Sequence, residues 1–330
     1  MAVMRAARIK VAAEMGEAAY HCMSRSVNGE LLFDDGAKEI LRRQFWLVAD
    51  FCGVEILTYA ILSNHFHILV HVPKKQPVGD TELLRRYEVL HPYPTPHQAA
   101  RLEAIQQLLA ANGPEAERWR KRQQALMGDI SAFMKLVKQR FSIWFNARHD
   151  RFGTLWAERF KSVLLEPGGR VLATVAAYID LNSVRAGLAE DPKDYRFCGY
   201  AEAVAGSVPL RRSLALVIGA TDWEAAQAAY RLALFGTAAG TPGHAAAITP
   251  EAIAAVITAR GRLPLATVLR CRLRYFSDGA VLGSRIFVES QLALYCVRTG
   301  RRHDCGVQFL PAVTDWGELT AMRKVRRAFG

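Results

Sequence analysis

The amino-acid sequence predicts an α+β protein: an antiparallel sheet with helices packed on it, followed by a mostly α-helical C-terminal domain. Two observations predict this fold class. The first 75 residues show a strand–helix–strand–strand pattern, and the chain becomes alanine-rich and helical in its apolar spacing after residue 200. Of the 330 residues, 51% are hydrophobic and 22% are charged, which excludes both a disordered chain and a membrane bundle.

The first four elements follow from alternation and from boundary residues. Residues 19–26 alternate as a strand, and Asp34 opens an amphipathic helix that ends at Gly53. Residues 55–62 and 65–72 are rich in β-branched and aromatic side chains and are separated by a two-residue turn. This hairpin is the best-defined local feature of the chain.

The rest of the chain divides into two predicted domains. The first domain, 1–205, contains a helical insertion at about 74–128, and the second, 206–330, is helical and basic. The further elements predicted in the first domain are helices at 98–127, 130–147 and 170–185, with a strand at 160–165. In the second domain we predict a linker at 236–243, a helix start at 249–251, and helices at 286–297 and 317–328.

The charge of the chain points to a polyanionic partner. Lys and Arg number 43 against 31 Asp and Glu, a net charge of +12, and nucleic acid is the first candidate for such a surplus. The alternative is that the positive charge only aids solubility. The six cysteines form no CxxC pair, and no secretory signal or membrane span is apparent, so we expect a cytoplasmic protein that joins the nucleoid when bound to DNA.

Two histidines at the head of the second hairpin strand form a candidate metal site. His65 and His67 point to one face of a strand, because side chains alternate across it. Paired imidazoles make a half-site for a divalent cation. For an isolated His-x-His pattern, hydrogen-bonded surface histidines are the favoured interpretation, and His71 on the same face makes the pair less distinctive.

The helix predicted at 170–185 carries a candidate nucleophile. Tyr178 and Asn182 lie one turn apart on one face, which also carries Arg185. Tyrosine acts as a nucleophile when a metal polarises the group it attacks. A partly buried core tyrosine is the alternative, and it is the usual one among the ten tyrosines of this chain.

Four segments in order along the chain resemble a known family. They are 20–25 (YHCMSR), 62–70 (LSNHFHILV), 160–162 (FKS) and 178–187 (YIDLNSVRAG). Together they resemble the bacterial HUH single-tyrosine transposases, especially the REP-associated tyrosine transposase branch, over about residues 19–200. The resemblance implies a ferredoxin-like or RRM-like HUH nuclease fold for domain 1–205.

The resemblance also implies roles for individual residues. His65 and His67 would bind Mg²⁺ or Mn²⁺, with Asn182, where many relatives have glutamine, as the third protein ligand. Tyr178 would attack a DNA phosphate, forming a 5′-phosphotyrosine and leaving a free 3′-hydroxyl. The implied partner is single-stranded, hairpin-forming DNA of a repeat element, and the chain would act as a homodimer or monomer without a membrane or small-molecule cofactor.

Basic side chains near these motifs are candidates for DNA contacts, because arginine and lysine neutralise phosphates. They are Arg25, Arg148, Arg151, Arg159 and Lys161. We assign the neighbouring aromatics Trp144, Phe145 and Trp156 to the core. The arginine-rich C-terminal third could form a helix-turn-helix-like DNA-binding domain or simply a packing domain with a solvated basic face.

The sequence therefore predicts a transposase-like endonuclease and strand transferase that cleaves and rejoins single-stranded DNA at hairpins. Two alternatives remain open at this stage. One is a domesticated, non-catalytic protein that binds repetitive palindromes, and the other is a metal-dependent hydrolase that forms no protein–DNA adduct.

Overall fold

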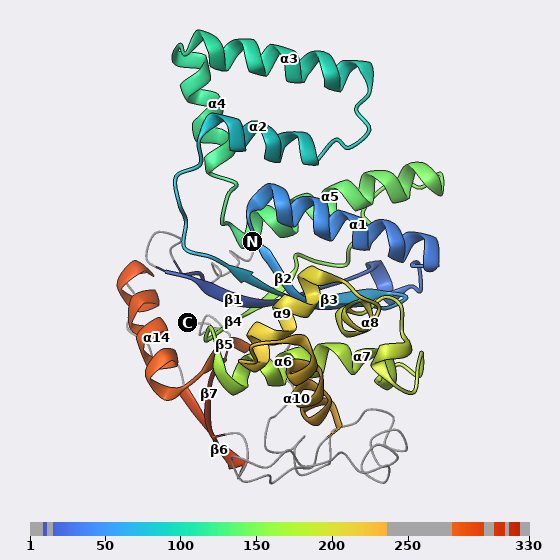
Figure 1. The fold of residues 1–330 in the computed structure, drawn as a ribbon, viewed down its shortest axis with the longest axis vertical. Coiled ribbons are helices and arrows are strands. Elements are labelled where there is room, and N and C mark those ends of the chain that lie inside the picture. Colours follow the sequence, from blue (N-terminus) through green and yellow to red (C-terminus); the bar gives the residue numbers. More distant parts are fainter. Residues whose placement is uncertain (1–8, 12–15, 236–278, 300–306, 314–316, 324–330) are drawn as a thin grey trace, which may run out of the picture.

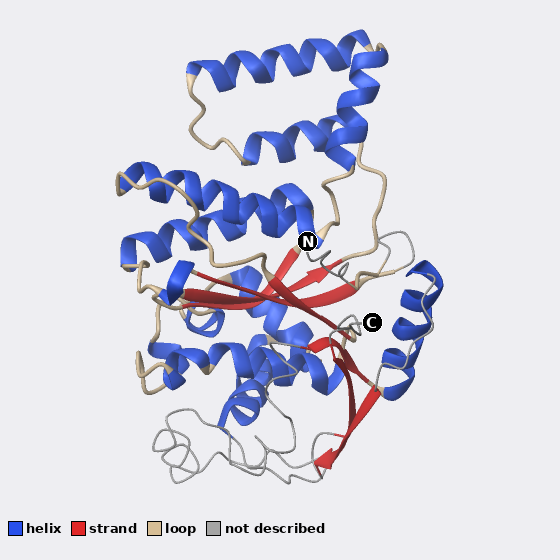
Figure 2. Cartoon of the chain, turned by 180° about the vertical axis from the view of Figure 1, so that it is seen from behind, coloured by secondary structure: helices blue, strands red, loops and turns tan. Residues whose placement is uncertain are grey.

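The computed structural model describes residues 9–11, 16–235, 279–299, 307–313 and 317–323, whose seven strands form one sheet with helices on both faces (Figures 1 and 2). The strands are β1 (Ala18–Arg25), β2 (Glu55–Ile61), β3 (His65–Val72), β4 (Lys161–Leu165), β5 (Gly279–Gly283), β6 (Val307–Val313) and β7 (Gly317–Arg323). The helices are α1 (Asp35–Cys52), α2 (Asp80–Val89), α3 (Pro96–Ala111), α4 (Pro114–Gln124), α5 (Ile130–Arg148), α6 (Gly169–Asp180), α7 (Asn182–Arg185), α8 (Gly199–Val204), α9 (Val208–Ile218), α10 (Trp223–Phe235) and α14 (Arg285–Thr299).

The first four strands confirm the predicted α+β, ferredoxin-like fold class. Their order is β2-β3-β1-β4, every pair among them is antiparallel, and α1 and α5 connect them in a βαββαβ sequence. The central position of β1 and β3 matters for function, because this register fixes which side chains lie next to one another. Arg25 pairs with His65, and Met23 pairs with His67.

Local sequence signals explain the bounds of α1 and the first hairpin. Asp34 caps α1 by accepting a hydrogen bond of 2.7 Å from the Ala37 amide. Gly53 ends the helix in the left-handed conformation at a φ of 63°, which glycine adopts without steric cost. The predicted two-residue turn joins β2 to β3, with a 2.8 Å hydrogen bond from Leu62 N to His65 O.

Helices α1 and α5 bury one face of the sheet. Phe45 of α1 contacts Phe66 of β3 with ring centroids 5.1 Å apart, and both side chains are fully buried. Phe141 of α5 packs on Phe33 at 5.4 Å. This aromatic core occupies the face of β3 opposite the histidines, so alternation of side chains leaves His65 and His67 on the other face.

Helices α2, α3 and α4 form a layer beyond α1 and α5 (Figure 1). The single helix predicted at 98–127 was wrong, because the chain turns at Asn112, which has a φ of 49°, and restarts at Pro114. Helix α2 lies within the predicted helical insertion at about 74–128. Arg120 of α4 holds α2 through a 2.8 Å ion pair with Asp80.

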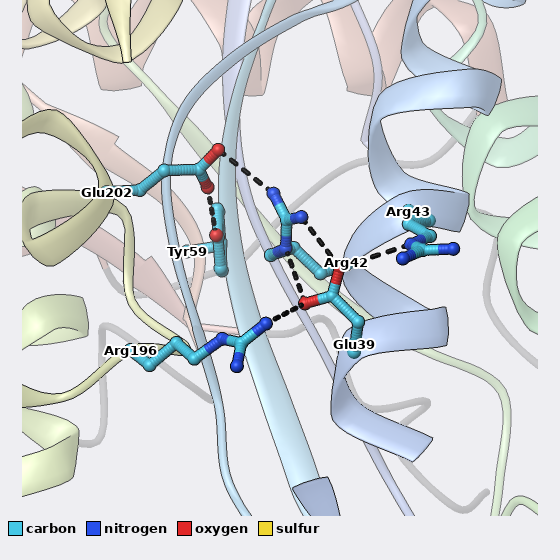
Figure 3. Close-up of polar contacts among 6 residues, drawn as sticks. All are labelled: Glu39, Arg42, Arg43, Tyr59, Arg196 and Glu202. Carbon is cyan, nitrogen blue, oxygen red and sulfur yellow. Dashed lines mark hydrogen bonds and ion pairs between the residues drawn. The ribbon is translucent and has the colours of Figure 1, made fainter. Parts of the chain in front are cut away.

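An ion-pair network joins α1, β2 and α8 around the edge of the sheet. Arg42 of α1 lies 2.8 Å from Glu39 and 3.0 Å from Glu202 of α8. The hydrogen bond from Arg42 lowers the pKa of Glu39 to about 2, so this carboxylate stays charged. Figure 3 shows the six members of the network: Glu39, Arg42, Arg43, Tyr59, Arg196 and Glu202. The network thereby ties α8 to α1 and to the edge strand β2.

The C-terminal third extends the sheet. Strand β5 runs parallel to β4, and the β6–β7 hairpin pairs with β5 through β7. Helix α14 confirms the helix predicted at 286–297. The helix predicted at 317–328 was wrong, because residues 317–323 form β7: this short segment alternates, and pairing with β6 decides between helix and strand.

Several predictions of the C-terminal region lie outside the described residues. They are the linker at 236–243, the helix start at 249–251 and part of the arginine-rich C-terminal third. The boundary at residue 205 stays a prediction, and helix α9, which follows it, packs against β2 and α6 of the first domain. Within the described residues, no helix is both long and apolar enough to cross a bilayer.

Candidate active site

The first histidine of β3 has a defined hydrogen-bonding partner. His65 Nδ1 lies 2.6 Å from Asn64 Oδ1, and Asn64 Nδ2 donates to the Gly29 carbonyl at 2.8 Å. The amide oxygen of Asn64 therefore faces the imidazole, and since it can only accept, His65 Nδ1 donates. The lone pair of His65 is left on Nε2, the arrangement found in metal-binding histidines.

The second histidine is paired with a histidine of β1. His67 Nδ1 lies 2.9 Å from His21 Nε2, and the two rings stack with centroids 5.1 Å apart. Both side chains are buried. His21 lies on the same face of β1 as Arg25, because side chains alternate, and the register of β1 against β3 brings it to His67.

Burial keeps His65 and His67 neutral. Burial, followed by the positive charges of Arg25 and Arg185, lowers the pKa of His65 to about 4. Burial is also the largest cause that holds the pKa of His67 well below its ordinary value. Neutral imidazole is the form that binds metal ions.

His71 differs from the other two histidines of β3. Its Nδ1 lies 2.8 Å from Glu55 and its Nε2 lies 3.3 Å from Glu17, so carboxylates occupy both ring nitrogens. It lies at the far end of the strand from His65. The sequence could not separate His71 from the candidate pair, whereas the structure does.

The tyrosine of the candidate site lies against these histidines. Tyr178 is half-buried on α6, a helix that packs on β2 and β3 (Figure 1). Its ring centroid is 5.9 Å from that of His67 and 6.0 Å from that of His21, both edge-on. Residues more than 100 positions apart in the sequence thus meet on one face of the sheet.

Asn182 lies one turn beyond Tyr178 and is buried. The helix predicted at 170–185 is divided at Leu181 into α6 and α7, and Asn182 is the first residue of α7. Its Nδ2 donates to the carbonyls of Tyr178 and Ile179 at 3.0 and 3.2 Å. The amide nitrogen is therefore engaged, and Oδ1 is the atom of this side chain with ligand chemistry.

The imidazole nitrogens of His65 and His67 and the amide oxygen of Asn182 are atom types that bind divalent cations. Two neutral imidazoles and one amide oxygen are ordinary ligands for transition-type divalent ions. Among the described residues, no group of three or more His, Cys, Asp or Glu side chains is arranged to hold a metal. The residues that fit are thus His65 and His67, with Asn182 as the amide that could complete them.

Arg185 is a site residue to which sequence reasoning gave no role. Its guanidinium carbon lies 4.1 Å from the centroid of the Tyr178 ring, and its Nη2 donates to the Tyr178 carbonyl at 2.6 Å. The signal was present in the sequence, because residues 178, 182 and 185 share a helical face.

Asp180 anchors the tyrosine helix by a separate set of contacts. It is fully buried and accepts hydrogen bonds from Thr58 of β2 at 2.8 Å and from Tyr230 of α10. Burial raises the pKa of Asp180 to about 7, although the hydrogen bonds act in the opposite direction. These contacts hold α6 against the edge strand and α10.

The candidate DNA contacts fall in two groups. Arg25 and Lys161 lie on the face of the histidines, since Arg25 pairs with His65 and Lys161 pairs with Met23. The second group, Arg148, Arg151 and Arg159, belongs to the end of α5 and the segment that leads to β4; Arg151 lies 4.0 Å from Glu30.

The aromatic assignments near this segment are largely confirmed. Phe145 and Trp156 are buried, and Trp144 is partly buried against the core. Trp156 also donates from Nε1 to Ser142 Oγ at 2.8 Å. Phe152 behaves differently and is 93% exposed.

The comparisons with known proteins add little to this geometry. No protein-family model matches the chain, and no curated protein matches it. A solved structure that matches is that of the REP-associated tyrosine transposase bound to a REP hairpin, at 14% identity and a TM-score of 0.39, over 63% of this chain and 88% of that chain. It has the name of the branch that the sequence motifs resemble.

Proposed function

We propose that this protein is a single-stranded DNA endonuclease and strand transferase that uses Tyr178 as its nucleophile. The observation that carries the proposal is the meeting of Tyr178 with the neutral, buried His67, at 5.9 Å between ring centroids. The ring of His67 lies in turn 5.2 Å from that of His65, the second candidate metal ligand. A tyrosine next to such a histidine pair has the composition of a phosphoryl-transfer site. The surplus positive charge of +12 supports a polyanionic substrate.

The proposed residues divide the work as follows. His65, His67 and Asn182 would hold Mg²⁺ or Mn²⁺, which neutralises phosphate charge when bound. Tyr178 Oη forms a bond to phosphorus as the bond to the 3′ oxygen breaks, giving a 5′-phosphotyrosine and a 3′-hydroxyl. The proton lost by the phenol is balanced by the one gained at the 3′ oxygen. Reversal of the same step rejoins the strand without a nucleotide cofactor.

The proposed substrate is hairpin-forming single-stranded DNA. The basic side chains offered to its backbone are Arg25, Arg148, Arg151, Arg159 and Lys161. Of these, Arg25 and Lys161 share the face of the histidines, so they are the ones we assign to phosphates next to the cleaved bond.

A covalent-adduct assay tests this function. The purified full-length chain is incubated with Mn²⁺ and a labelled hairpin oligonucleotide and analysed under denaturing conditions. We expect an adduct that disappears in Tyr178→Phe and persists in Tyr93→Phe, a control at a 92% exposed tyrosine. DNA cleavage without an adduct identifies a hydrolase instead, and binding without cleavage identifies a non-catalytic DNA-binding protein; either result contradicts the proposal.

A further inference from the structure

Arg185 is a cation without an anionic partner in the part of the chain that the structure describes. Within the described residues, no carboxylate forms an ion pair with it. Its Nη2 donates to the Tyr178 carbonyl at 2.6 Å, and its guanidinium also interacts with the Tyr178 side chain. Its Nε is buried without an acceptor. Burial lowers the pKa of Arg185, yet a guanidinium stays protonated in proteins, so an uncompensated positive charge remains.

This charge lies beside the proposed nucleophile. The guanidinium covers the Tyr178 ring at 4.1 Å, a cation–π contact that fixes both groups relative to one another. Its positive charge also reaches the histidines, because it contributes to the lowered pKa values of His65 and His67. A half-buried cation whose Nε has no acceptor among the described residues thus lies beside the tyrosine and acts electrostatically on the histidine pair.

We propose that Arg185 is the phosphate-binding residue of this site, which receives the phosphate group that becomes attached to Tyr178. The inference rests on the proposed function for the identity of that phosphate, but not for the existence of an anion site. Arginine donates in a planar fork that matches phosphate oxygens, and among the described residues Nε has no acceptor. An anion there supplies the acceptor that the buried Nε lacks.

Arg211 provides a matched control. Its guanidinium also stacks on an aromatic ring, at 5.3 Å from the Trp223 centroid, and its Nε donates to the Ala203 carbonyl at 2.8 Å. It therefore reproduces the helix-capping and cation–π contacts of Arg185. It lies on α9, and its Nε is satisfied by the backbone, so it should not bind an anion in the same way.

The first test uses inorganic phosphate and the metal-free protein. The melting temperatures of wild type, Arg185→Gln, Arg185→Lys and Arg211→Gln are compared in phosphate and in chloride at equal ionic strength. We expect phosphate to raise the melting temperature of wild type and of Arg211→Gln. The increase should be absent in Arg185→Gln and smaller than in wild type in Arg185→Lys. An equal phosphate shift in Arg185→Gln, or no shift in wild type, overturns the proposal.

The second test measures the rate of adduct formation at saturating hairpin DNA. Removing a donor aimed at developing charge typically costs about 100-fold or more, so Arg185→Gln should slow the adduct by at least that factor, while Arg211→Gln should not. An unchanged rate in Arg185→Gln overturns the role in transfer. If wild type forms no adduct, the proposed function fails, whereas the phosphate experiment still decides the anion site by itself.

Discussion

Asp180, at the end of α6, and Arg185, at the end of α7, are ionisable side chains that the rest of the protein treats in opposite ways. Asp180 is fully buried and receives hydrogen bonds from Thr58 and Tyr230. Arg185 lies beside the Tyr178 ring, and its buried Nε has no acceptor among the residues that the structure describes. The comparison distinguishes anchoring from ligand binding. The Asp180 carboxylate, which holds the helix, has hydrogen-bond partners inside the protein, whereas Arg185 Nε, next to the site, has none among the described residues.

The histidines of β3 show the same contrast, because His71 is bonded to carboxylates whereas His65 and His67 are the candidate metal ligands. Substitutions here should have the largest effect on adduct formation. We expect His65→Ala and His67→Ala to abolish adduct formation with only a modest loss of DNA affinity, because both would hold the metal ion. His71 lies on the same face of β3 but is bonded to Glu55, so His71→Ala should retain adduct formation. Single-turnover adduct assays and binding titrations measure both quantities. Full activity of either His65→Ala or His67→Ala would remove these residues from the proposed mechanism.

Asp180, which anchors α6, should make the free energy of unfolding depend on pH. The folded-state pKa of Asp180 is raised to about 7 from 3.8, so the folded protein binds the extra proton between these values. Its contribution is therefore fully present below about pH 4 and is lost as the pH rises through 7, by up to about 4 kcal/mol. The lowered pKa values of His65 and His67 act in the opposite direction, removing stability as the pH falls below 6.5.

Urea unfolding of wild type and Asp180→Asn from pH 4.5 to 8 isolates the acid from the histidines. The difference between their free energies of unfolding should change progressively across this range, with wild type losing more stability as the pH rises. Asp194→Asn, at an exposed carboxylate, serves as the control and should give a curve parallel to wild type. A parallel curve for Asp180→Asn would show that the buried acid does not titrate as described.

A smaller loss of stability is expected from a substitution at the contact between α8 and the edge strand β2. A Cβ on Gly199 would lie 2.9 Å from Thr58 Cα and would also meet Thr58 Oγ1, which donates to Asp180. Gly199→Ala should therefore cost about 1–3 kcal/mol of unfolding free energy, since backbone must shift. Gly36→Ala, where the nearest atom is 3.4 Å away, is the control and should not destabilise. Equal stability of the two variants in urea would contradict the close packing.

The sequence predicted the fold best where local patterns are complete. The bounds of β3 and α1 follow from alternation, from the Asp34 cap and from Gly53. The shared face of His65 and His67 follows from the same alternation. In contrast, β7 is a short alternating segment whose state depends on pairing with β6, so its local pattern did not decide between helix and strand.

The candidate site could be predicted only in part, because several of its contacts join distant segments. The pairing of His21 with His67 depends on the β1–β3 register, which the sequence does not determine. The partners of Asp180 come from β2 and α10, so an isolated acid on an apolar helix gave no signal. Arg185 shared a helical face with Tyr178, yet its missing partner is visible only in three dimensions.

Mapping the covalent adduct tests the central claim most directly. The adduct formed with a hairpin oligonucleotide and Mn²⁺ is digested with nuclease and protease, and the modified peptide is identified by mass spectrometry. We predict a single 5′-phosphonucleotide on the peptide that contains Tyr178, and none in the Tyr178→Phe variant. A nucleotide on another residue, or cleaved DNA with unmodified protein, would contradict the assignment of Tyr178 as the nucleophile.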